Sequence, residues 1–439
     1  MQTAQLIFNP HAGSLEWTRI IDAFLAFWRR RGWAVSLMPT EYPGHAIELA
    51  KRAAREETAL VFAAGGDGTL NEVANGLAHS DTILAPLPVG TANILAKELK
   101  LPTPSMMRTE WWTEMLDELA GGVVQRMDLG HSVGGQYVGE HRVSKLANIE
   151  GSSGRFWMLW ASTGADGFVV DRIEPRTPKA KRLGMWGYAV KAAWFLPAFK
   201  GISGQVSIDE RVFSGDFLMV NVSNCRRYAA GDFNLNRGGV LDDGLFEVWI
   251  FRGKRWPMLL RYSIVVGLEG QSYDPNIERV QGKHVRIETD LACPFHLDAE
   301  PGGSTPLECT IQPGALRILV PASTPKGLFS KPGTQLAGLR CVDRRISYVR
   351  RGTSALPMQP WLTQAGYEVS REFKGIDMQE IAIRVGERLL RAEMNNSVTA
   401  KRIVESLPIS AAANVWGDEI YFGISENLDL DADAVAEVA

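Results

Sequence analysis

The feature that most constrains this sequence is an apolar run, Val61–Ala64, that ends in a glycine-rich turn. The turn reads Gly65-Gly66-Asp67-Gly68-Thr69, and the spacing of an amphipathic helix follows it directly from Leu70. Glycines allow backbone N–H groups to approach a ligand closely, and the start of a helix favours anions. The stretch therefore predicts a buried strand, a phosphate-binding loop and a helix.

A carboxylate in a phosphate-binding loop is unusual, because it needs a cation beside it or a role in proton transfer. The presence of Asp67 therefore indicates a bound cation or a role in proton transfer. A plain strand-to-helix turn with Asp67 as the helix N-cap explains the same residues. The stretch is neither a Walker A loop nor a dinucleotide fingerprint, since no Gly-Lys-Ser/Thr follows and the glycines lack the G-x-G-x-x-G spacing. The local pattern leaves both interpretations open.

Length and composition are those of an ordinary globular protein with more than one domain. The 439 residues allow two or three domains, and 45% hydrophobic residues are enough for buried cores. A net charge of −3 provides no general attraction to nucleic acid, so no nucleic-acid partner is expected. The four cysteines form no C-x-x-C pair, which argues against a zinc site and a disulfide framework.

The sequence shows no targeting or membrane-spanning segment. Its first residues lack a basic stretch followed by an apolar one, and no run reaches the roughly 18 apolar residues of a membrane span. One helical pattern, 184–196, carries two tryptophans behind three basic residues, which suits a lipid interface or packing against a sheet. We expect a cytoplasmic protein that can also lie peripherally at the inner face of the membrane.

Strands alternate with helices four times in the first part of the chain. Four apolar runs have the length of strands, and a helical pattern follows each of them: Gln5–Phe8, Ala34–Met38, Ala59–Ala63 and Ile83–Pro88. This alternation predicts an α/β domain, a doubly wound parallel sheet, over residues 1–127. Ligands of such sheets bind at the carboxyl ends of the strands, where this chain has Asn9, Thr40, Gly65–Asn71 and Gly90–Asn93.

After Asp128 the pattern changes to short alternating runs separated by Gly, Asn and Asp, which predicts an antiparallel β-sandwich over residues 128–328. The predicted strands are Trp157–Ala161, Gly204–Ile208, Phe217–Val222, Leu245–Phe251 and His284–Glu288. Residues 329–377 have the composition of a linker. A last unit, 378–439, begins with two strands around the turn Gly386-Glu387, continues with a helix at Ala400–Ser406 and closes at Trp416–Phe422.

Four motifs in order connect the chain to a known family. They are Gly65-Gly66-Asp67-Gly68-Thr69-Leu70-Asn71-Glu72, Pro88-Val89-Gly90-Thr91-Ala92-Asn93, Asp242-Asp243-Gly244-Leu245 and Asp298-Ala299-Glu300. Together they resemble the bacterial diacylglycerol kinase-like lipid kinases, which are related to sphingosine kinases and more distantly to NAD kinases. The resemblance implies an NAD-kinase-like nucleotide-binding domain, a β-sandwich domain, and ATP with its lipid substrate in the cleft between them.

The resemblance and the positions of the loops also imply roles for individual residues. Glu300 would take the proton of a lipid hydroxyl as it attacks the γ-phosphate of ATP, and Asp67 would organise Mg²⁺ and phosphate. Asp128 would be a second active-site aspartate, with a turn aspartate as the alternative. The residues expected at ATP are Asn9, Thr40, Gly65, Gly66, Asp67, Gly68, Thr69, Leu70, Asn71, Gly90, Thr91 and Asn93.

A second, structural Mg²⁺ site occurs in several family members. Its loop corresponds here to backbone carbonyls of Val240 and Leu245 and the carboxylate of Asp243, an all-oxygen set that suits a hard cation. An ordinary Asp-Asp-Gly β-turn is the alternative.

Two positions depart from the family pattern. Ala299 stands where a glycine is usual, and alanine strongly disfavours a positive φ. Ile94-Leu95-Ala96 replaces the common Asp-Phe-Ala, which bears on the acceptor. A lipid at a membrane surface remains the expected substrate. A kinase of a soluble metabolite such as NAD, and a catalytically weak kinase-like regulatory protein, are the alternatives, and a homodimer is left open.

The end of the chain has a resemblance of its own. Residues from about Met378 to Ala439 are similar to a small prokaryotic cyclophilin-like β-barrel family. Such barrels normally continue for several more strands. We therefore expect a partial β-barrel-like unit with open edges.

Overall fold

The computed structural model describes residues 2–10, 17–104, 111–135, 154–173, 191, 194–229, 231, 233–336, 366–371, 379–385, 388–394, 409–416 and 419–422. The chain divides into two compact units, Met1–Arg344 and Arg345–Ala439. Within the described residues no helix is both long and apolar enough to cross a bilayer. Of the helical segment predicted at 184–196, residues 184–190, 192 and 193 lie outside the described part of the chain.

A parallel sheet opens the first unit. Its strands are β1 (Gln2–Phe8), β2 (Trp33–Pro39), β3 (Leu60–Gly65) and β4 (Ile83–Pro88), in the order β2-β1-β3-β4. β3 and β4 are buried along their whole length, as expected for apolar runs in the middle of a parallel sheet. Phe8 is level with both Pro39 and Ala64, so the carboxyl ends of these strands meet at one edge.

Five helices pack around this sheet: α1 (Trp17–Arg30), α2 (His45–Arg55), α3 (Asp67–Leu77), α4 (Ile94–Leu99) and α5 (Trp111–Ala120). Phe24 of α1 packs edge-on to Phe62 of β3, 4.9 Å between ring centroids, and also contacts Trp112 of α5. The predicted parallel sheet with its helices is confirmed, and α5 is an additional helix. The doubly wound arrangement stays a prediction.

Antiparallel strands form the rest of the first unit, and they confirm the predicted change of pattern. They are β5 (Val123–Gly135), β6 (Arg155–Trp157), β7 (Trp160–Gly164), β8 (Ile202–Ile208), β9 (Arg211–Ser223), β10 (Arg227–Tyr228), β11 (Phe233–Asn234), β12 (Phe246–Arg252), β13 (Ile277–Gly282), β14 (His284–Thr289), β15 (Pro294–Leu297), β16 (Glu300–Val320) and β17 (Thr334–Gln335). The helices of this part are α6 (Ala165–Ile173), η2 (Leu196–Ala198), α9 (Pro257–Gly267) and η3 (Gln271–Tyr273).

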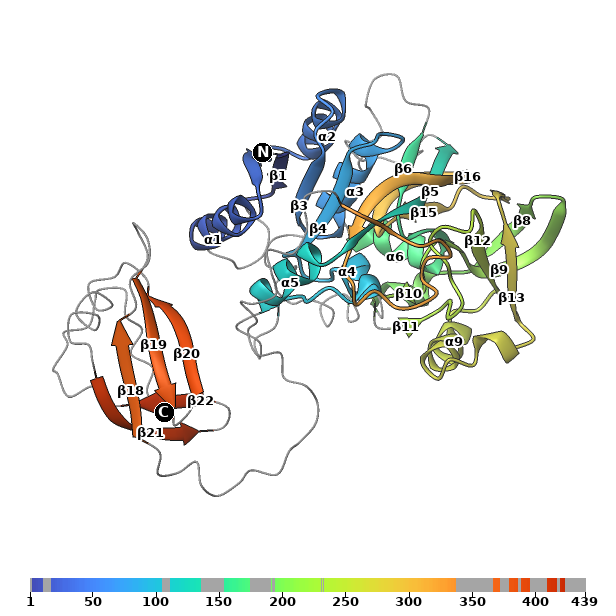
Figure 1. Cartoon of the computed structure of the whole chain (residues 1–439). Helices are drawn as coiled ribbons and strands as arrows, with labels where there is room; N and C mark the ends of the chain where they lie inside the picture. The colour runs from blue at the N-terminus through green and yellow to red at the C-terminus, as the bar shows by residue number, and fades with distance from the viewer. Residues whose placement is uncertain are drawn as a thin grey trace. The chain divides into compact units, whose positions relative to one another are not determined.

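The strand β16 joins the two kinds of sheet. It pairs antiparallel with β14, β15 and β5, and then parallel with β4 through Arg317 and Ile318. Figure 1 shows this long orange strand running from the antiparallel part into the parallel sheet. Two separate groups of buried apolar residues lie on either side of the junction. The strand that begins with Glu300 is therefore anchored in both halves of the unit.

The second unit is a five-stranded antiparallel sheet in the order β20-β19-β18-β21-β22. Its strands are β18 (Gly366–Arg371), β19 (Gln379–Val385), β20 (Arg388–Met394), β21 (Ile409–Trp416) and β22 (Glu419–Phe422), which form the expected partial barrel-like sheet. β17 and β18 fall inside the range predicted as linker. The helix predicted at 400–406 lies outside the described residues, and the division into domains at 127, 328 and 377 stays a prediction.

Candidate active site

The loops predicted to converge do lie side by side. The backbone N–H of Asn9 donates to the carbonyl of Ala64 at 3.2 Å, and that of Thr40 donates to Phe8 at 2.9 Å. Val89 donates to Gly65 at 3.2 Å. The four loops after β1, β2, β3 and β4 therefore form one edge of the molecule.

The glycine loop and the loop after β4 are in backbone-to-backbone contact. A Cβ added to Gly90 would lie 2.3 Å from the Cα of Gly66, so no side chain fits there. A Cβ on Gly65 would similarly lie 2.4 Å from the Cβ of Thr69. These glycines are required for the close approach of the chain to itself, and this approach aligns two loops at the start of α3.

Asp67 is not the N-cap of its own helix, because Gly66 occupies that position without a side-chain cap. Asp67 is the first residue of α3, and its Oδ1 accepts the N–H of Ile94 at 2.7 Å. It therefore caps the neighbouring helix α4, and the turn interpretation in its simple form is wrong. Burial raises the pKa of the Asp67 carboxyl to about 6, although backbone N–H donors oppose that shift.

Two asparagines of the motifs are occupied by structural contacts. Asn93 closes its own turn, since its Oδ1 accepts the N–H of Gly90 at 3.0 Å and its Nδ2 donates to the Gly90 carbonyl at 2.8 Å. Asn71 is 1% exposed and donates to Asp298 Oδ2 at 2.5 Å. Both side chains hold loops in place, and their direct contact with ATP stays a prediction.

Glu300 lies against the glycine loop. A Cβ added to Gly68 would lie 2.8 Å from Glu300 Oε1, so Gly68 leaves the room that the carboxylate occupies. The loop and the expected catalytic carboxylate are 232 positions apart in the sequence, and β16 brings them together. This contact agrees with the role that the family resemblance implies for Glu300.

Arg155 is a member of this site that the sequence did not reveal. Its guanidinium forms an ion pair with Glu300 and donates to Asn71 Oδ1 at 3.1 Å. The side chain is 14% exposed, and its Nη1 is buried with no hydrogen-bond partner among the described residues. The only signal in the sequence is a basic residue at the start of an apolar strand.

The carboxylate of Asp298 fixes the turn before Glu300 through backbone hydrogen bonds. It accepts the backbone N–H groups of Met158 at 2.8 Å, Leu159 at 2.8 Å and Trp160 at 3.0 Å. Asp298 and Ala299 have φ values of 51° and 63°, so the position of the missing family glycine does have positive φ. Asp298 is thus used to fix the turn, and Glu300 is the carboxylate that faces the loop.

A buried polar chain continues from this turn. The N–H of Ala299 donates to His296 Nδ1 at 3.3 Å, and His296 Nε2 lies 3.2 Å from Asp166 Oδ2. The hydroxyl of Tyr228 donates to the same oxygen of Asp166 at 2.8 Å. The turn before Glu300 is therefore connected to α6 and to β10.

Asp128 lies elsewhere. Its two carboxylate oxygens accept the N–H groups of Gly244 and Gly314, both at 2.6 Å, where β16 bulges away from β5. Among the described residues no hydrogen bond or ion pair joins it to Glu300. Burial raises the pKa of the Asp128 carboxyl. Asp128 lies within β5 and not in a turn, and its carboxylate joins that strand to the 240–245 loop and to the bulge of β16. A direct role of Asp128 in the active site stays a prediction.

The loop predicted to hold a second metal ion, residues 240–245, forms a turn. Asp243 is exposed, and its Oδ1 accepts the N–H of Leu245 at 3.0 Å. Partial burial, followed by the nearby charges of Asp128, Glu247 and Asp242, raises the pKa of the Asp243 carboxyl. Among the described residues no three His, Cys, Asp or Glu side chains converge as metal ligands. The site formed by Val240, Asp243 and Leu245 stays a prediction.

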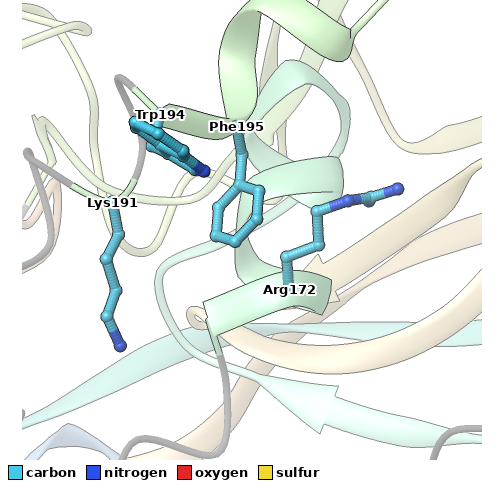
Figure 2. A pocket seen from close by; sticks show the side chains of 4 residues that line it. All are labelled: Arg172, Lys191, Trp194 and Phe195. Carbon is cyan, nitrogen blue, oxygen red and sulfur yellow. The ribbon is translucent and has the colours of Figure 1, made fainter.

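The predicted aromatic segment is described only at its end. Arg172, Lys191, Trp194 and Phe195 line a shallow cavity of about 270 Å³, in which the Phe195 ring lies between Trp194 and Arg172 (Figure 2). Trp194 is 82% exposed. The outward position of this tryptophan argues against its packing in the core.

Comparisons with known proteins agree with this geometry. The family model described as "Diacylglycerol kinase catalytic domain" matches residues 3–132, and "YegS C-terminal NAD kinase beta sandwich-like domain" matches residues 160–320. The description "Cyclophilin-like" matches residues 379–439. The first match covers the glycine loop, and the second covers the turn that carries Glu300. Arg155 lies between the two matched ranges.

Curated relatives and solved structures point the same way. The chain is 29% identical over 311 residues to a diacylglycerol kinase of Bacillus subtilis, covering 70% of this chain and 93% of that protein. A diacylglycerol kinase of Staphylococcus epidermidis is 26% identical over 332 residues, covering 75% and 94%. The crystal structure of a putative diacylglycerol kinase from Bacillus anthracis shares the fold, with a TM-score of 0.56 at 19% identity over 74% of this chain and 99% of that one. Over residues 3–320 this chain is therefore similar to the bacterial diacylglycerol kinases in two consecutive domains.

Proposed function

We propose that this chain is an ATP-dependent lipid kinase that transfers the γ-phosphate to the hydroxyl of diacylglycerol or a related glyceryl or sphingoid lipid. The observation that carries the proposal is the position of Glu300 beside Gly68 of the glycine loop. The names of the relatives support a lipid acceptor. The residues of this chain supply a general base and backbone N–H donors to the phosphates, and a bound cation would balance the charge.

Glu300 acts as the general base. Its carboxylate accepts the proton of the lipid hydroxyl while the hydroxyl oxygen attacks the γ-phosphate. Arg155 is a positioning residue, since its guanidinium holds that carboxylate against the glycine loop and links it to Asn71. Backbone N–H groups of Gly65–Thr69, at the start of the eleven-residue helix α3, bind the phosphates.

Two carboxylates of this chain, Asp67 and Asp243, would hold magnesium ions. Mg²⁺ bound with ATP neutralises the charge on the phosphates. Asp67 would hold it at the glycine loop, where a cation would favour the ionised form of a carboxyl whose pKa is now about 6. Asp243 would hold a second ion with the carbonyls of Val240 and Leu245, because burial and then the charges of Asp128, Glu247 and Asp242 raise the pKa of its carboxyl, and a cation would oppose those charges.

The acceptor is tested directly with labelled ATP. The wild-type protein is offered γ-labelled ATP with diacylglycerol, sphingoid lipids, soluble polyols and NAD, and the product is identified. Transfer to a lipid is expected. Label on NAD or polyols alone would show a kinase of soluble metabolites, and label on none of the acceptors would favour the regulatory alternative.

The role of Glu300 is tested with Glu300→Gln, which keeps the size of the side chain. Turnover should fall by about 10²-fold or more while ATP still binds. Arg155→Gln should lower turnover more than it weakens ATP binding, because it releases Glu300 without touching the glycine loop. Glu300→Gln with unchanged turnover would remove Glu300 from the mechanism.

The place of action follows from the acceptor. A kinase of membrane lipids would work from the cytoplasm at the inner face of the membrane, as a peripheral protein. Fractionation of cells that produce the full chain tests this. Recovery from the membrane fraction, and release from it by salt, is the expected result.

A further inference from the structure

The helix α9 has apolar side chains on two opposite faces. One face packs on the antiparallel strands through Tyr262 and Val266, and the Tyr262 ring lies 5.4 Å from that of Phe251. The Tyr262 hydroxyl also donates to the carbonyl of Arg252 at 2.5 Å. The helix is therefore firmly seated, and its other face is presented outward as a rigid surface.

That outward face is apolar. Leu260 is 57% exposed, Ile264 63% and Leu268 79%, and a spacing of four residues places them in one row. Tyr273 follows at 89% exposure, and Phe233 of β11 lies against Gly267 at the side of the row. Scattered exposed apolar residues are ordinary, but a contiguous row on one helix marks an interaction surface.

The charges around α9 suit an anionic surface. The helix contains no Asp or Glu, and Lys254, Arg255 and Arg261 flank or belong to it. The carboxylates beside these residues are balanced by ion pairs: Asp216 with Lys254 at 3.2 Å and Asp274 with Arg261 at 2.6 Å. Glu269 is likewise paired with Arg237. Exposed Arg255 adds a positive charge, so the surface would not be repelled by acidic headgroups.

A series of hydrogen bonds and strand pairings connects this surface to the turn before Glu300. β11 lies under α9, where Asn234 donates to Glu269 at 3.1 Å, and β11 pairs with β10. Tyr228 of β10 donates to Asp166, which meets His296, the residue that receives the N–H of Ala299. In Figure 1 β10 and β11 lie between α9 and α4. The helix α9 is thus linked through β11 and β10 to the turn that holds Glu300.

We propose that the outward face of α9, formed by Leu260 and Ile264 and continued by its C-cap Leu268 and by Tyr273 of η3, docks on the surface of an anionic lipid bilayer. The apolar row enters the boundary between headgroups and acyl chains, and Arg255 meets the lipid phosphates. The choice of a lipid surface rests on the proposed function. The docked helix brings the catalytic turn to the membrane in which an acceptor lipid resides.

The experiment compares full-length variants in vesicle co-sedimentation. Leu260→Gln/Ile264→Gln/Leu268→Gln keeps good helix formers on α9 while it removes the apolar row. The matched control is Val212→Gln/Leu291→Gln, at positions that are 55% and 83% exposed on other segments. Vesicles are equimolar phosphatidylcholine and phosphatidylglycerol, or phosphatidylcholine alone.

The triple variant should partition to the anionic vesicles at least about tenfold more weakly than wild type, because three exposed apolar side chains no longer leave water. The control should bind as wild type, and both variants should transfer phosphate to detergent-dispersed lipid at the wild-type rate. Wild-type protein that stays in the supernatant, or a triple variant that binds fully, would overturn the proposal. So would a triple variant that binds normally but dissociates from dimer to monomer in sedimentation, since the face would then contact a second copy.

The outcome is separable from that of the proposed function. Vesicle binding that depends on α9, in a protein that phosphorylates no lipid, would support the docking face and refute the lipid kinase. Lipid phosphorylation by a protein that does not bind vesicles through α9 would support the lipid kinase and refute the docking face.

Discussion

Glu300 is aimed by the two residues before it, which both have a left-handed backbone. Asp298 tolerates this conformation because its carboxylate is held by three N–H groups of Met158–Trp160. Ala299 has no such compensation, and its Cβ is strained at a φ of 63°. The turn is thus maintained by the hydrogen bonds around it against the preference of one of its residues.

Replacing Ala299 with glycine should therefore stabilise the protein. Relief of the left-handed strain, about 1–2 kcal/mol, exceeds the added entropy of the unfolded chain, so the free energy of unfolding should rise by up to about 1 kcal/mol. Denaturant unfolding of both proteins measures this. A lower free energy of unfolding for Ala299→Gly would show that the alanine methyl group makes a contact worth more than the strain.

Asp67 should make stability depend on pH. Its pKa is about 6 in the folded protein, against about 3.9 in an unfolded chain. The folded state binds the proton of Asp67 more tightly than the unfolded state does. Below about pH 4 both states are protonated, and Asp67 does not lower the free energy of unfolding. As the pH rises towards 6, the unfolded state loses the proton first, and the free energy of unfolding falls.

The measurement is a comparison of wild type with Asp67→Asn, whose amide oxygen can still accept the N–H of Ile94. Between pH 4 and pH 7 the wild type should lose about 1–3 kcal/mol more of its free energy of unfolding than the variant. Other buried carboxyls with raised pKa, such as Glu98 and Asp128, contribute equally to both proteins and cancel. Parallel pH profiles would contradict the prediction.

At the scale of the elements, the packing of α2 on α3 depends on one glycine. A Cβ added to Gly76 would lie 2.4 Å from the Cβ of Ala50 and 2.7 Å from the carbonyl oxygen of Ile47. Because α3 begins at the glycine loop, the position of that helix also sets the position of the N–H groups that we propose bind phosphate.

Gly76→Ala should push the two helices apart. The gain in helix propensity, about 1 kcal/mol, is smaller than the cost of overpacking, so a net loss of about 1–3 kcal/mol in the free energy of unfolding is expected. Gly121→Ala is the control, since its Cβ would meet nothing closer than 3.5 Å. Equal stability of the two variants would mean that α2 and α3 can separate freely.

At the scale of the whole molecule, the first unit extends beyond the region matched to the family domains. β17 pairs with Val123 and Val124 of β5, and Leu336 packs partly on the buried core. The boundary between the two compact units follows Arg344. The first unit should therefore need residues up to about that point to be fully stable.

Two shortened chains test this boundary. A chain that ends at Arg344 should show the thermal unfolding and the ATP binding of the first unit in the full protein. A chain that ends at Pro332 lacks β17 and should be less stable by about 1–2 kcal/mol, through lost pairing and apolar burial. Two shortened chains of equal stability would show that β17 adds nothing.

The elements that the sequence predicted well are those with one clear periodicity. Ile83–Pro88 was predicted with the bounds that the structure has, because a buried parallel strand is apolar throughout. α9 was missed for a physical reason: its apolar residues lie on both faces, so its pattern resembles neither an amphipathic helix nor a strand. Arg155 was missed because its partner Glu300 is 145 residues away.

The sequence by itself determined the glycine loop, the alternation of strands and helices and the order of the motifs, because these depend on neighbours along the chain. It also indicated, through the family resemblance, that Glu300 carries the chemistry. Only the tertiary structure decided what each carboxylate is used for: Asp298 and Asp128 are taken up by backbone N–H groups, Asp67 caps α4, and Glu300 faces the loop. Those uses depend on donors brought in from distant strands, and no local pattern records them.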